Sequence, residues 1–161
     1  MKVLAIDPGF DRVGVAVVEK TGGKEAVLFS ECFVTDKKQT FYLRLATVGA
    51  RIKELIKKYD PDALAIETLF FSTNVKTAMR VAEARGAIIY QAAALGVDVF
   101  EYSPQDVKIA VTGYGKATKD QVSAMTRRLA KIDAKKKTLD DEMDAIALGL
   151  AHCAMYKSSK R

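Results

Sequence analysis

The sequence predicts an α/β fold built on a mixed five-stranded sheet, with three antiparallel strands first and alternating helices and strands after them. Three patterns support this prediction. Segment 2–35 contains apolar runs separated by tight turns, which is typical of a strand meander. Later segments repeat apolar residues every three or four positions, which is typical of amphipathic helices. Short apolar runs lie between these helical segments, as expected for strands that join the sheet through crossover connections.

The first strand is the uncharged run Val3–Ile6, followed by Asp7 and the turn residues Pro8-Gly9. Because the run is short, apolar and β-branched, we expect a central strand buried on both faces. Asp7 then lies where this strand leaves the sheet. An unpaired carboxylate at such a position is costly to desolvate, so Asp7 either meets a cation or simply caps its own turn.

The second and third strands are predicted at Arg12–Glu19 and Glu25–Thr35, joined by a hairpin turn at Thr21–Lys24 that contains two glycines. An amphipathic helix follows at Phe41–Tyr59, with charged residues, Arg44 among them, between its apolar positions.

The Asp60-Pro61 pair ends that helix, and the next apolar run, Ala63–Ile66, ends in a second carboxylate, Glu67. If this fourth strand is a parallel neighbour of the first, Asp7 and Glu67 emerge together at the carboxyl edge of the sheet. Open α/β sheets usually bind their ligands at that edge.

The rest of the chain continues the alternation of helix and strand. The next helix is rich in small side chains, which allow close approach of another helix from the same or a second subunit. The expected elements are a helix at Val75–Leu95, a strand at Val97–Tyr102, a short helix from Ser103-Pro104 that breaks at Thr112–Lys116, a helix at Ala117–Ala130, and a final helix at Leu139–Tyr156.

The final helix carries further acids. Asp141 and Asp144 are three residues apart and share a face, and Asp144 lies on the same stripe as Leu148 and Ala151. An N-cap at Thr138 followed by acids that favour the positive end of the helix dipole explains Asp141 and its neighbours. Capping does not explain Asp144, an acid on the inward stripe one turn later.

Composition limits the class of protein. A chain of 161 residues with 49% hydrophobic content fits one domain, which we assign to residues 1–157, with 158–161 as a frayed basic tail. No apolar run reaches the roughly 18 residues that span a bilayer, and no secretory pattern occurs, so we expect a soluble, cytoplasmic protein without a membrane partner. The formal charge of +6 indicates a polyanionic partner or a merely solvated basic surface.

The few cysteine and histidine residues exclude several kinds of site. Cys32 and Cys153 lie far apart in apolar stretches and are interpreted as buried thiols, so neither a disulfide framework nor a zinc site is indicated. His152 is the only histidine, which disfavours a Ser-His-Asp hydrolase and leaves oxygen ligands for any metal. Oxygen ligands favour Mg²⁺ or Mn²⁺. The absence of a Walker motif excludes a P-loop ATPase.

The four carboxylates Asp7, Glu67, Asp141 and Asp144 could together hold two divalent cations if the final helix packs against the strand ends. Two such ions can orient a water, hold a scissile phosphate and stabilise the leaving oxygen of an in-line displacement. Without metal the like charges would repel, so we expect a poorly ordered or partly protonated site.

A series of short motifs, in this order, resembles the RuvC family of Holliday-junction resolvases, which belongs to the ribonuclease-H-like superfamily. The resemblance covers nearly the whole chain. Its motifs are Ile6-Asp7-Pro8-Gly9 with Gly14, Ile66-Glu67 followed by Phe70 and Asn74, Ala82-Glu83-Ala84-Arg85-Gly86, Tyr102-Ser103-Pro104 with Val107-Lys108, Gly113-Tyr114-Gly115 with Lys119, and Asp141-Glu142-Met143-Asp144-Ala145-Ile146-Ala147.

This resemblance implies a ribonuclease-H-like fold and a homodimeric, Mg²⁺-dependent endonuclease, with Mn²⁺ as a substitute metal. Such an enzyme nicks two opposing strands of four-way junction DNA symmetrically, in recombination and repair, and leaves 5′-phosphate and 3′-hydroxyl ends. A further implied partner is the branch-migration complex bound to the same junction.

The resemblance also assigns residues. Asp7, Glu67, Asp141 and Asp144 match the metal-binding acids of the family, and Asp141 stands where some members use His. The expected DNA-binding residues are Phe70, which would stack on junction bases, Asn74, Lys108, Lys116 and Lys119. From the sequence alone, each lysine could be an ordinary solvated charge and Phe70 a core aromatic.

The segment Phe10-Asp11-Arg12 departs from the small or polar residues expected after the first Asp-Pro-Gly. Two alternative functions stay open: a related ribonuclease-H-like nuclease that processes RNA, and a junction-binding module without catalytic activity.

Overall fold

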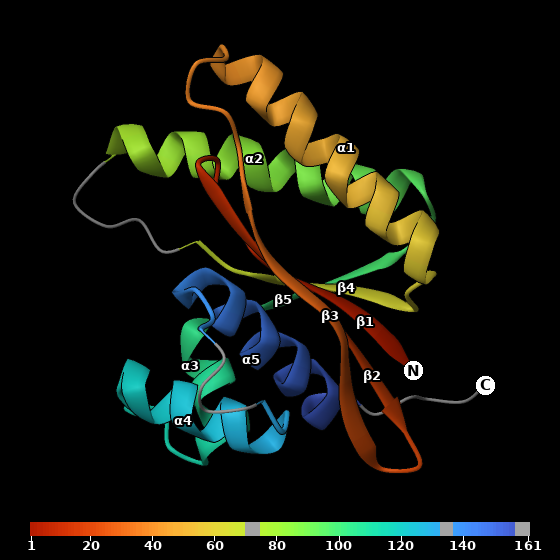
Figure 1. Ribbon diagram of the computed structural model, residues 1–161, viewed down its shortest axis with the longest axis vertical. Helices are drawn as coiled ribbons and strands as arrows, with labels where there is room; N and C mark the ends of the chain where they lie inside the picture. Colours follow the sequence, from red (N-terminus) through yellow and green to blue (C-terminus); the bar gives the residue numbers. More distant parts are fainter. Residues whose placement is uncertain (70–74, 133–136, 157–161) are drawn as a thin grey trace.

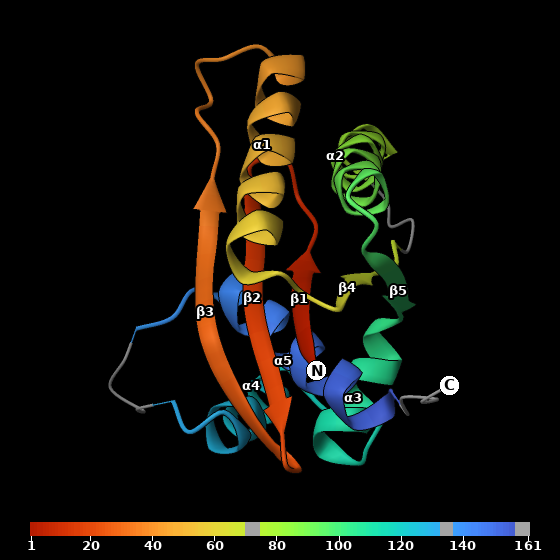
Figure 2. The same ribbon diagram turned by 90° about the vertical axis from the view of Figure 1, so that its right-hand side faces the viewer.

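The computed structural model describes residues 1–69, 75–132 and 137–156. Its centre is a five-stranded sheet with the spatial order β3-β2-β1-β4-β5 (Figure 2). β1 is antiparallel to β2, and β2 to β3, whereas β1 pairs with β4, and β4 with β5, in parallel. The predicted mixed sheet is therefore confirmed. The strands are β1 (Lys2–Asp7), β2 (Arg12–Thr21), β3 (Lys24–Val34), β4 (Ala63–Glu67) and β5 (Asp98–Tyr102).

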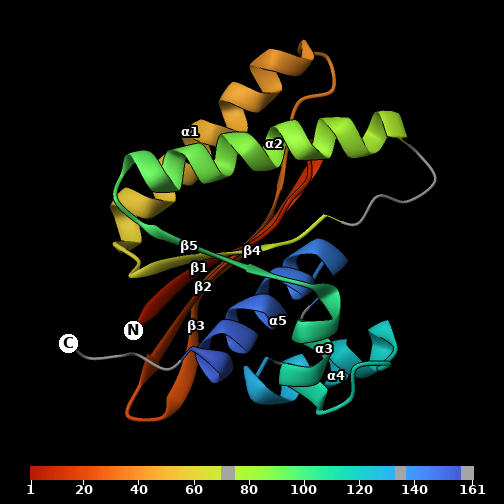
Figure 3. The same ribbon diagram turned by 180° about the vertical axis from the view of Figure 1, so that it is seen from behind.

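Helices cover both faces of the sheet (Figure 1). α1 and α2 lie on one face, and the C-terminal helix α5 crosses the other, with α3 and α4 packed beside it (Figure 3). None of the helices in the described parts of the chain is long and apolar enough to cross a membrane. The helices are α1 (Phe41–Tyr59), α2 (Val75–Ala94), α3 (Pro104–Thr112), α4 (Lys119–Leu129) and α5 (Asp140–Met155).

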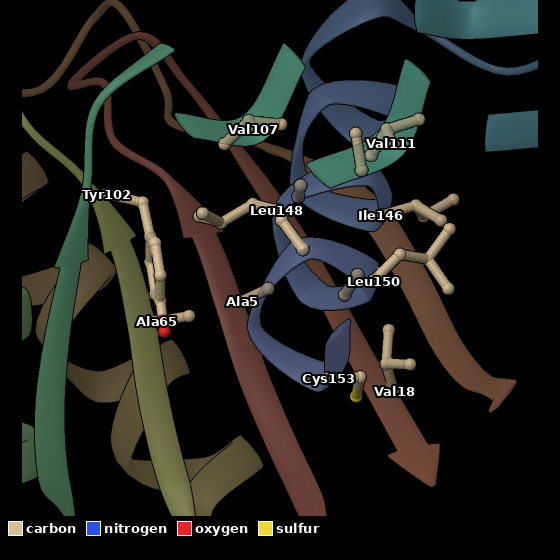
Figure 4. Packing of buried hydrophobic residues seen from close by; sticks show 14 of the residues in the cluster. Ala5, Val18, Ala65, Tyr102, Val107, Val111, Ile146, Leu148, Leu150 and Cys153 are labelled. Carbon is tan, nitrogen blue, oxygen red and sulfur yellow. The ribbon is translucent and has the colours of Figure 1, made fainter. Parts of the chain in front are cut away.

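Strand alternation divides the core into two layers. In β1, Leu4 and Ile6 face α1 and α2, whereas Val3 and Ala5 face α5, and all four are fully buried. This burial on both faces is what the uncharged run at the N-terminus predicts. Ala5 lies in the layer beneath α5 together with Leu148 and other apolar side chains of that helix (Figure 4).

Local sequence signals fix the ends of several elements. Gly22 and Gly23 both have positive φ, at 58° and 79°, and this permits the tight hairpin between β2 and β3. Asp60 ends α1 in the left-handed conformation, immediately before Pro61. Ser103 caps α3 through a reciprocal pair of hydrogen bonds with Asp106.

Three expectations about single residues need correction. Arg44 is buried rather than on a polar face, because Asp11 and Thr35 meet its guanidinium. The N-cap of α5 is Leu139, which makes no side-chain cap bond, and not Thr138. Cys153 is a buried thiol as predicted, but Cys32 is only partly buried, since it lies on the edge strand β3. The predicted frayed tail at 158–161 lies outside the described residues.

Candidate active site

Successive side chains of a strand point to opposite faces of the sheet, and this alternation directs Asp7 and Glu67 toward α5. Asp7 follows Val3 and Ala5 in the odd register of β1, and Glu67 follows Ala63 and Ala65 in the odd register of β4. Because β1 and β4 are parallel neighbours, these carboxylates leave the sheet at the same edge. They also leave it on the face that α5 covers. This is the juxtaposition that the two strand-end acids predict.

The third acid comes from α5, and the three carboxylates interact. Burial raises the pKa of Asp7 to about 7, and the negative charges of Glu67 and Asp144 add to the rise. Burial also raises the pKa of Glu67, again with a contribution from Asp144. Three acids from distant parts of the chain thus form a cluster that is costly to ionise without a cation, and we call it the acid cluster.

Lys119, at the start of α4, is the basic residue in closest electrostatic contact with the acid cluster. Its Nζ lies 3.2 Å from Oδ2 of Asp144 and 3.4 Å from Oδ2 of Asp140. Its positive charge lowers the pKa of both Asp7 and Glu67. Lys119 thus forms ion pairs beside the acid cluster while its side chain stays 59% exposed, and its expected contact with DNA stays a prediction.

A cavity of about 260 Å³ opens beside these groups. Its charged lining consists of two acids and two lysines, which are Glu67, Asp144, Lys108 and Lys119. The remaining wall is apolar and comes from α3, α4 and α5. Two carboxylates and two ammonium groups in one cavity can hold a cation and an anionic group next to each other, which a phosphodiester-cleaving site requires.

The second acid of α5, Asp141, has a different environment. Its carboxylate accepts a hydrogen bond from Nη2 of Arg12, the first residue of β2, and forms an ion pair with it. Sγ of Cys32 lies 3.8 Å from the same Oδ2 atom. The main chain of Asp141 packs on β2 at Gly14, where an added Cβ would lie 1.9 Å from the Asp141 carbonyl oxygen. Gly14 therefore lets the start of α5 approach the strand that carries Arg12.

The turn between β1 and β2 is also held in place, by a cluster of aromatic and arginine side chains around Phe10. The Phe10 ring meets Phe41 edge to face at 5.7 Å, and the guanidinium groups of Arg44 and Arg80 lie over Phe10. Asp11 forms ion pairs with Arg44 and with Lys37. The side chains that depart from the expected pattern are thus engaged on the α1 and α2 side of the sheet, except for Arg12.

The main chain of Glu67 is held in place by a residue of α2. Nε of Arg85, on α2, donates a hydrogen bond to the main-chain carbonyl of Glu67 at 3.1 Å. Nη2 of Arg85 lies 2.8 Å from a carboxylate oxygen of Glu101, on β5. The sequence places Arg85 in a recognisable motif but gives no sign of this contact, because its partners come from two other elements.

The donor set fits a hard divalent cation. Carboxylate oxygens are the ligands that such ions prefer, and His152 is buried in the core against Tyr102. As the side chains stand, no three acidic, thiol or imidazole groups in the described part of the chain lie close enough to hold a metal ion. The carboxylates of Asp144 and Asp141 pair instead with Lys119 and Arg12.

The other predicted DNA-binding residues fall elsewhere. Lys116 is exposed on the loop between α3 and α4 and does not line the cavity. Phe70 and Asn74 lie outside the described residues. Arg12 is the site residue whose role sequence reasoning missed, and the departure from the expected turn was the signal that could have drawn attention to it.

Comparisons with known proteins agree on one family. The family model for the crossover junction endodeoxyribonuclease RuvC matches residues 3–152. The chain is 42% identical to the RuvC of Thermosipho melanesiensis over 92% of this chain and 94% of that protein. It is also 42% identical to the RuvC of Moorella thermoacetica, over 96% of this chain and 92% of that protein.

Solved structures give the same answer. RuvC from Thermus thermophilus in complex with a Holliday junction substrate superposes with a TM-score of 0.89 at 32% identity, covering 96% of this chain and 93% of that one. A second Thermus thermophilus RuvC structure gives a TM-score of 0.85 at 33% identity, covering 95% of this chain and 93% of that one. With the acid cluster at the sheet edge and matches along nearly its whole length, this chain belongs to the RuvC family of crossover junction endodeoxyribonucleases.

Proposed function

We propose that this crossover junction endodeoxyribonuclease binds four-way junction DNA as a homodimer and nicks two opposing strands symmetrically, using Mg²⁺ held by Asp7, Glu67, Asp141 and Asp144. The observation that carries the proposal is the convergence of three acids at one edge of the sheet, where the charges of Glu67 and Asp144 raise the pKa of Asp7 and the charge of Asp144 raises the pKa of Glu67. Mn²⁺ is the expected substitute metal, since it takes the same oxygen ligands. The products would carry 5′-phosphate and 3′-hydroxyl ends.

Each part of the site has a role in this reaction. Asp7, Glu67 and Asp144 provide the ligand oxygens, and Asp141 joins them when its carboxylate is free. Bound Mg²⁺ would activate a water and stabilise the leaving oxygen of an in-line displacement. Lys108 and Lys119 line the same cavity and are positioned to bind the anionic phosphate. The formal charge of +6 would add a general attraction to the DNA backbone.

The exposed face of α2 supports a homodimer. Met79 and Tyr90 are 59% and 68% exposed, and between them nothing lies within 4 Å of a Cβ added at Gly86. These three positions are seven and four residues apart and so share one face of the helix. A face with apolar side chains around a bare backbone suits close packing with the same helix of a second copy. Two copies would present two sites to symmetric strands.

The other expected contacts rest on family membership. They are stacking of Phe70 on junction bases, contacts from Asn74 and Lys116 to DNA, and a branch-migration complex as partner on the same junction. Membership in a family of endodeoxyribonucleases argues against the RNA-processing alternative. The intact acid cluster argues against a binding module without catalytic activity.

The test uses a labelled synthetic four-way junction with Mg²⁺. We expect Asp7→Asn to abolish nicking while junction binding survives, because phosphate contacts by basic residues dominate affinity. The matched control is Asp98→Asn, which removes the same charge from an exposed position at the opposite end of the parallel strands. Its nicking rate should equal that of the unaltered protein. Equal cleavage of a linear duplex by the unaltered protein would contradict junction specificity.

A second test addresses the aromatic residue. We expect Phe70→Ala to impair cleavage more than binding at low salt, where charge determines affinity. Equal losses in cleavage and binding would remove Phe70 from the proposed stacking role.

A further inference from the structure

Arg12 is a cation at the edge of the acid cluster with no role in the proposed reaction. It is the first residue of β2 and belongs to the register that faces α5, since Ala16 and Val18 further along β2 pack in that layer. Its side chain is 46% exposed and pairs with the Asp141 carboxylate, which is 27% exposed. The adjacent acid, Asp11, pairs instead with Arg44 and Lys37.

The same oxygen of Asp141 cannot serve two cations fully. Oδ2 accepts the Arg12 hydrogen bond and faces the Cys32 thiol. A divalent ion that bound this oxygen would meet the guanidinium charge at contact distance. Arg12 also acts on the neighbouring acid, because its charge lowers the pKa of Asp7. A single half-exposed side chain therefore pairs with Asp141 and also acts on Asp7 through its charge.

We propose that Arg12 is an internal counter-ion that competes with a divalent cation for Asp141, so that full metal binding breaks the Arg12–Asp141 ion pair. This inference rests on the proposed function, in which Asp141 is a metal ligand. It also gives a reason for the Phe10-Asp11-Arg12 segment. Phe10 and Asp11 anchor the turn to α1 and α2, which leaves Arg12 directed at α5.

The competition makes a specific prediction about metal affinity. Removing Arg12 should tighten metal binding, whereas loss of a residue that only supports the fold would weaken it. An exposed or half-exposed ion pair changes an equilibrium by a modest factor, so we expect Arg12→Gln to lower the dissociation constant for Mn²⁺ by about threefold to tenfold. Arg12→Lys keeps the charge and should stay within about twofold of the unaltered protein.

The experiment is a double-mutant cycle on the full-length protein, with free Mn²⁺ measured by its EPR signal. The four proteins are the unaltered chain, Arg12→Gln, Asp141→Asn, and the double variant. We expect the gain from Arg12→Gln to shrink to less than about twofold when Asp141 is already Asn, because the competition acts through that carboxylate. Lys24→Gln removes a charge from the far hairpin and should change affinity by less than about twofold. Thermal unfolding confirms that each variant is folded.

Two results would overturn the inference. An equal gain from Arg12→Gln in both backgrounds would mean that Arg12 acts only as a distant charge. No gain, or weaker binding, from Arg12→Gln in the protein that retains Asp141 would mean that Arg12 does not compete with the metal at all. Failure of the proposed function would look different, since the unaltered protein would then show no Mn²⁺ binding that Asp7→Asn removes.

Discussion

Replacing Asp7 by Asn should stabilise the metal-free protein while destroying its activity. Asp7 is partly buried at the end of a central strand, and the negative charges of Glu67 and Asp144 act on it. Its carboxylate is therefore destabilised by burial and by like charge when it ionises. The amide of Asn has nearly the same shape and no charge, so this substitution removes the electrostatic cost without creating a cavity.

The size and pH dependence of this gain follow from the pKa. The pKa of Asp7 rises from an ordinary value of 3.8 to about 7 in the folded protein. In the unaltered protein, the unfolded state loses this proton before the folded state does. The contribution of Asp7 to stability is therefore lost as pH rises from about 4 to about 7, and stays constant above that. At about 1.36 kcal/mol per pH unit, the advantage of Asp7→Asn reaches at most about 4 kcal/mol at pH 8.

The assay is urea unfolding in the presence of a chelator at several pH values between 4 and 8. Asp98→Asn is the control, because it removes an exposed carboxylate and should give a curve parallel to that of the unaltered protein. Adding Mg²⁺ should raise the stability of the unaltered protein by mass action and leave Asp7→Asn unchanged. If Asp7→Asn is less stable than the unaltered protein at pH 8 without metal, the argument for a strained acid cluster is refuted.

Three further predictions concern packing and titration. Gly149→Ala should lower the free energy of unfolding by about 1–3 kcal/mol in urea titrations, because its Cβ would lie 2.5 Å from Val18 in the α5 and β2 interface. Gly14→Ala should weaken Mn²⁺ binding at least about tenfold in EPR titrations, because it pushes the start of α5 away from β2; unchanged affinity would contradict this. Burial lowers the pKa of His152 to about 4, so the contribution of this residue to stability should fall by up to about 3 kcal/mol from pH 6.5 to 4. Because Asp7 has the opposite effect over the same range, this fall is measured in the Asp7→Asn protein, where His152→Gln should flatten it.

The sheet was well predicted from the sequence, because each strand has a recognisable local pattern of apolar residues and turn residues. The unbroken run of β1 and the paired glycines of the hairpin each point to one structure, and both are observed. Two apolar runs that each end in an acid suggested the hypothesis that β1 and β4 are parallel neighbours, and the observed pairing confirms it. Thr138 was a misleading cap signal, because Leu139 holds the N-cap position and Thr138 lies one residue further out.

Features of the site that depend on one helix or strand could be predicted from the sequence, whereas contacts between different elements could not. The spacing of Asp141 and Asp144 showed that they share a helix face, but not that one pairs with Arg12 and the other with Lys119. Arg12 and Asp141 are 129 residues apart, and no local pattern relates them. The burial of Arg44 could not be predicted for the same reason, since its partners lie on the β1–β2 turn and at the end of β3.

The most direct test of the metal-binding proposal is anomalous diffraction from crystals soaked in Mn²⁺. We expect a strong peak within bonding distance of carboxylate oxygens from Asp7, Glu67 and Asp144, lost in crystals of Asp7→Asn. A well-ordered crystal with these three side chains intact, and with no peak beside them at millimolar Mn²⁺, would contradict the account.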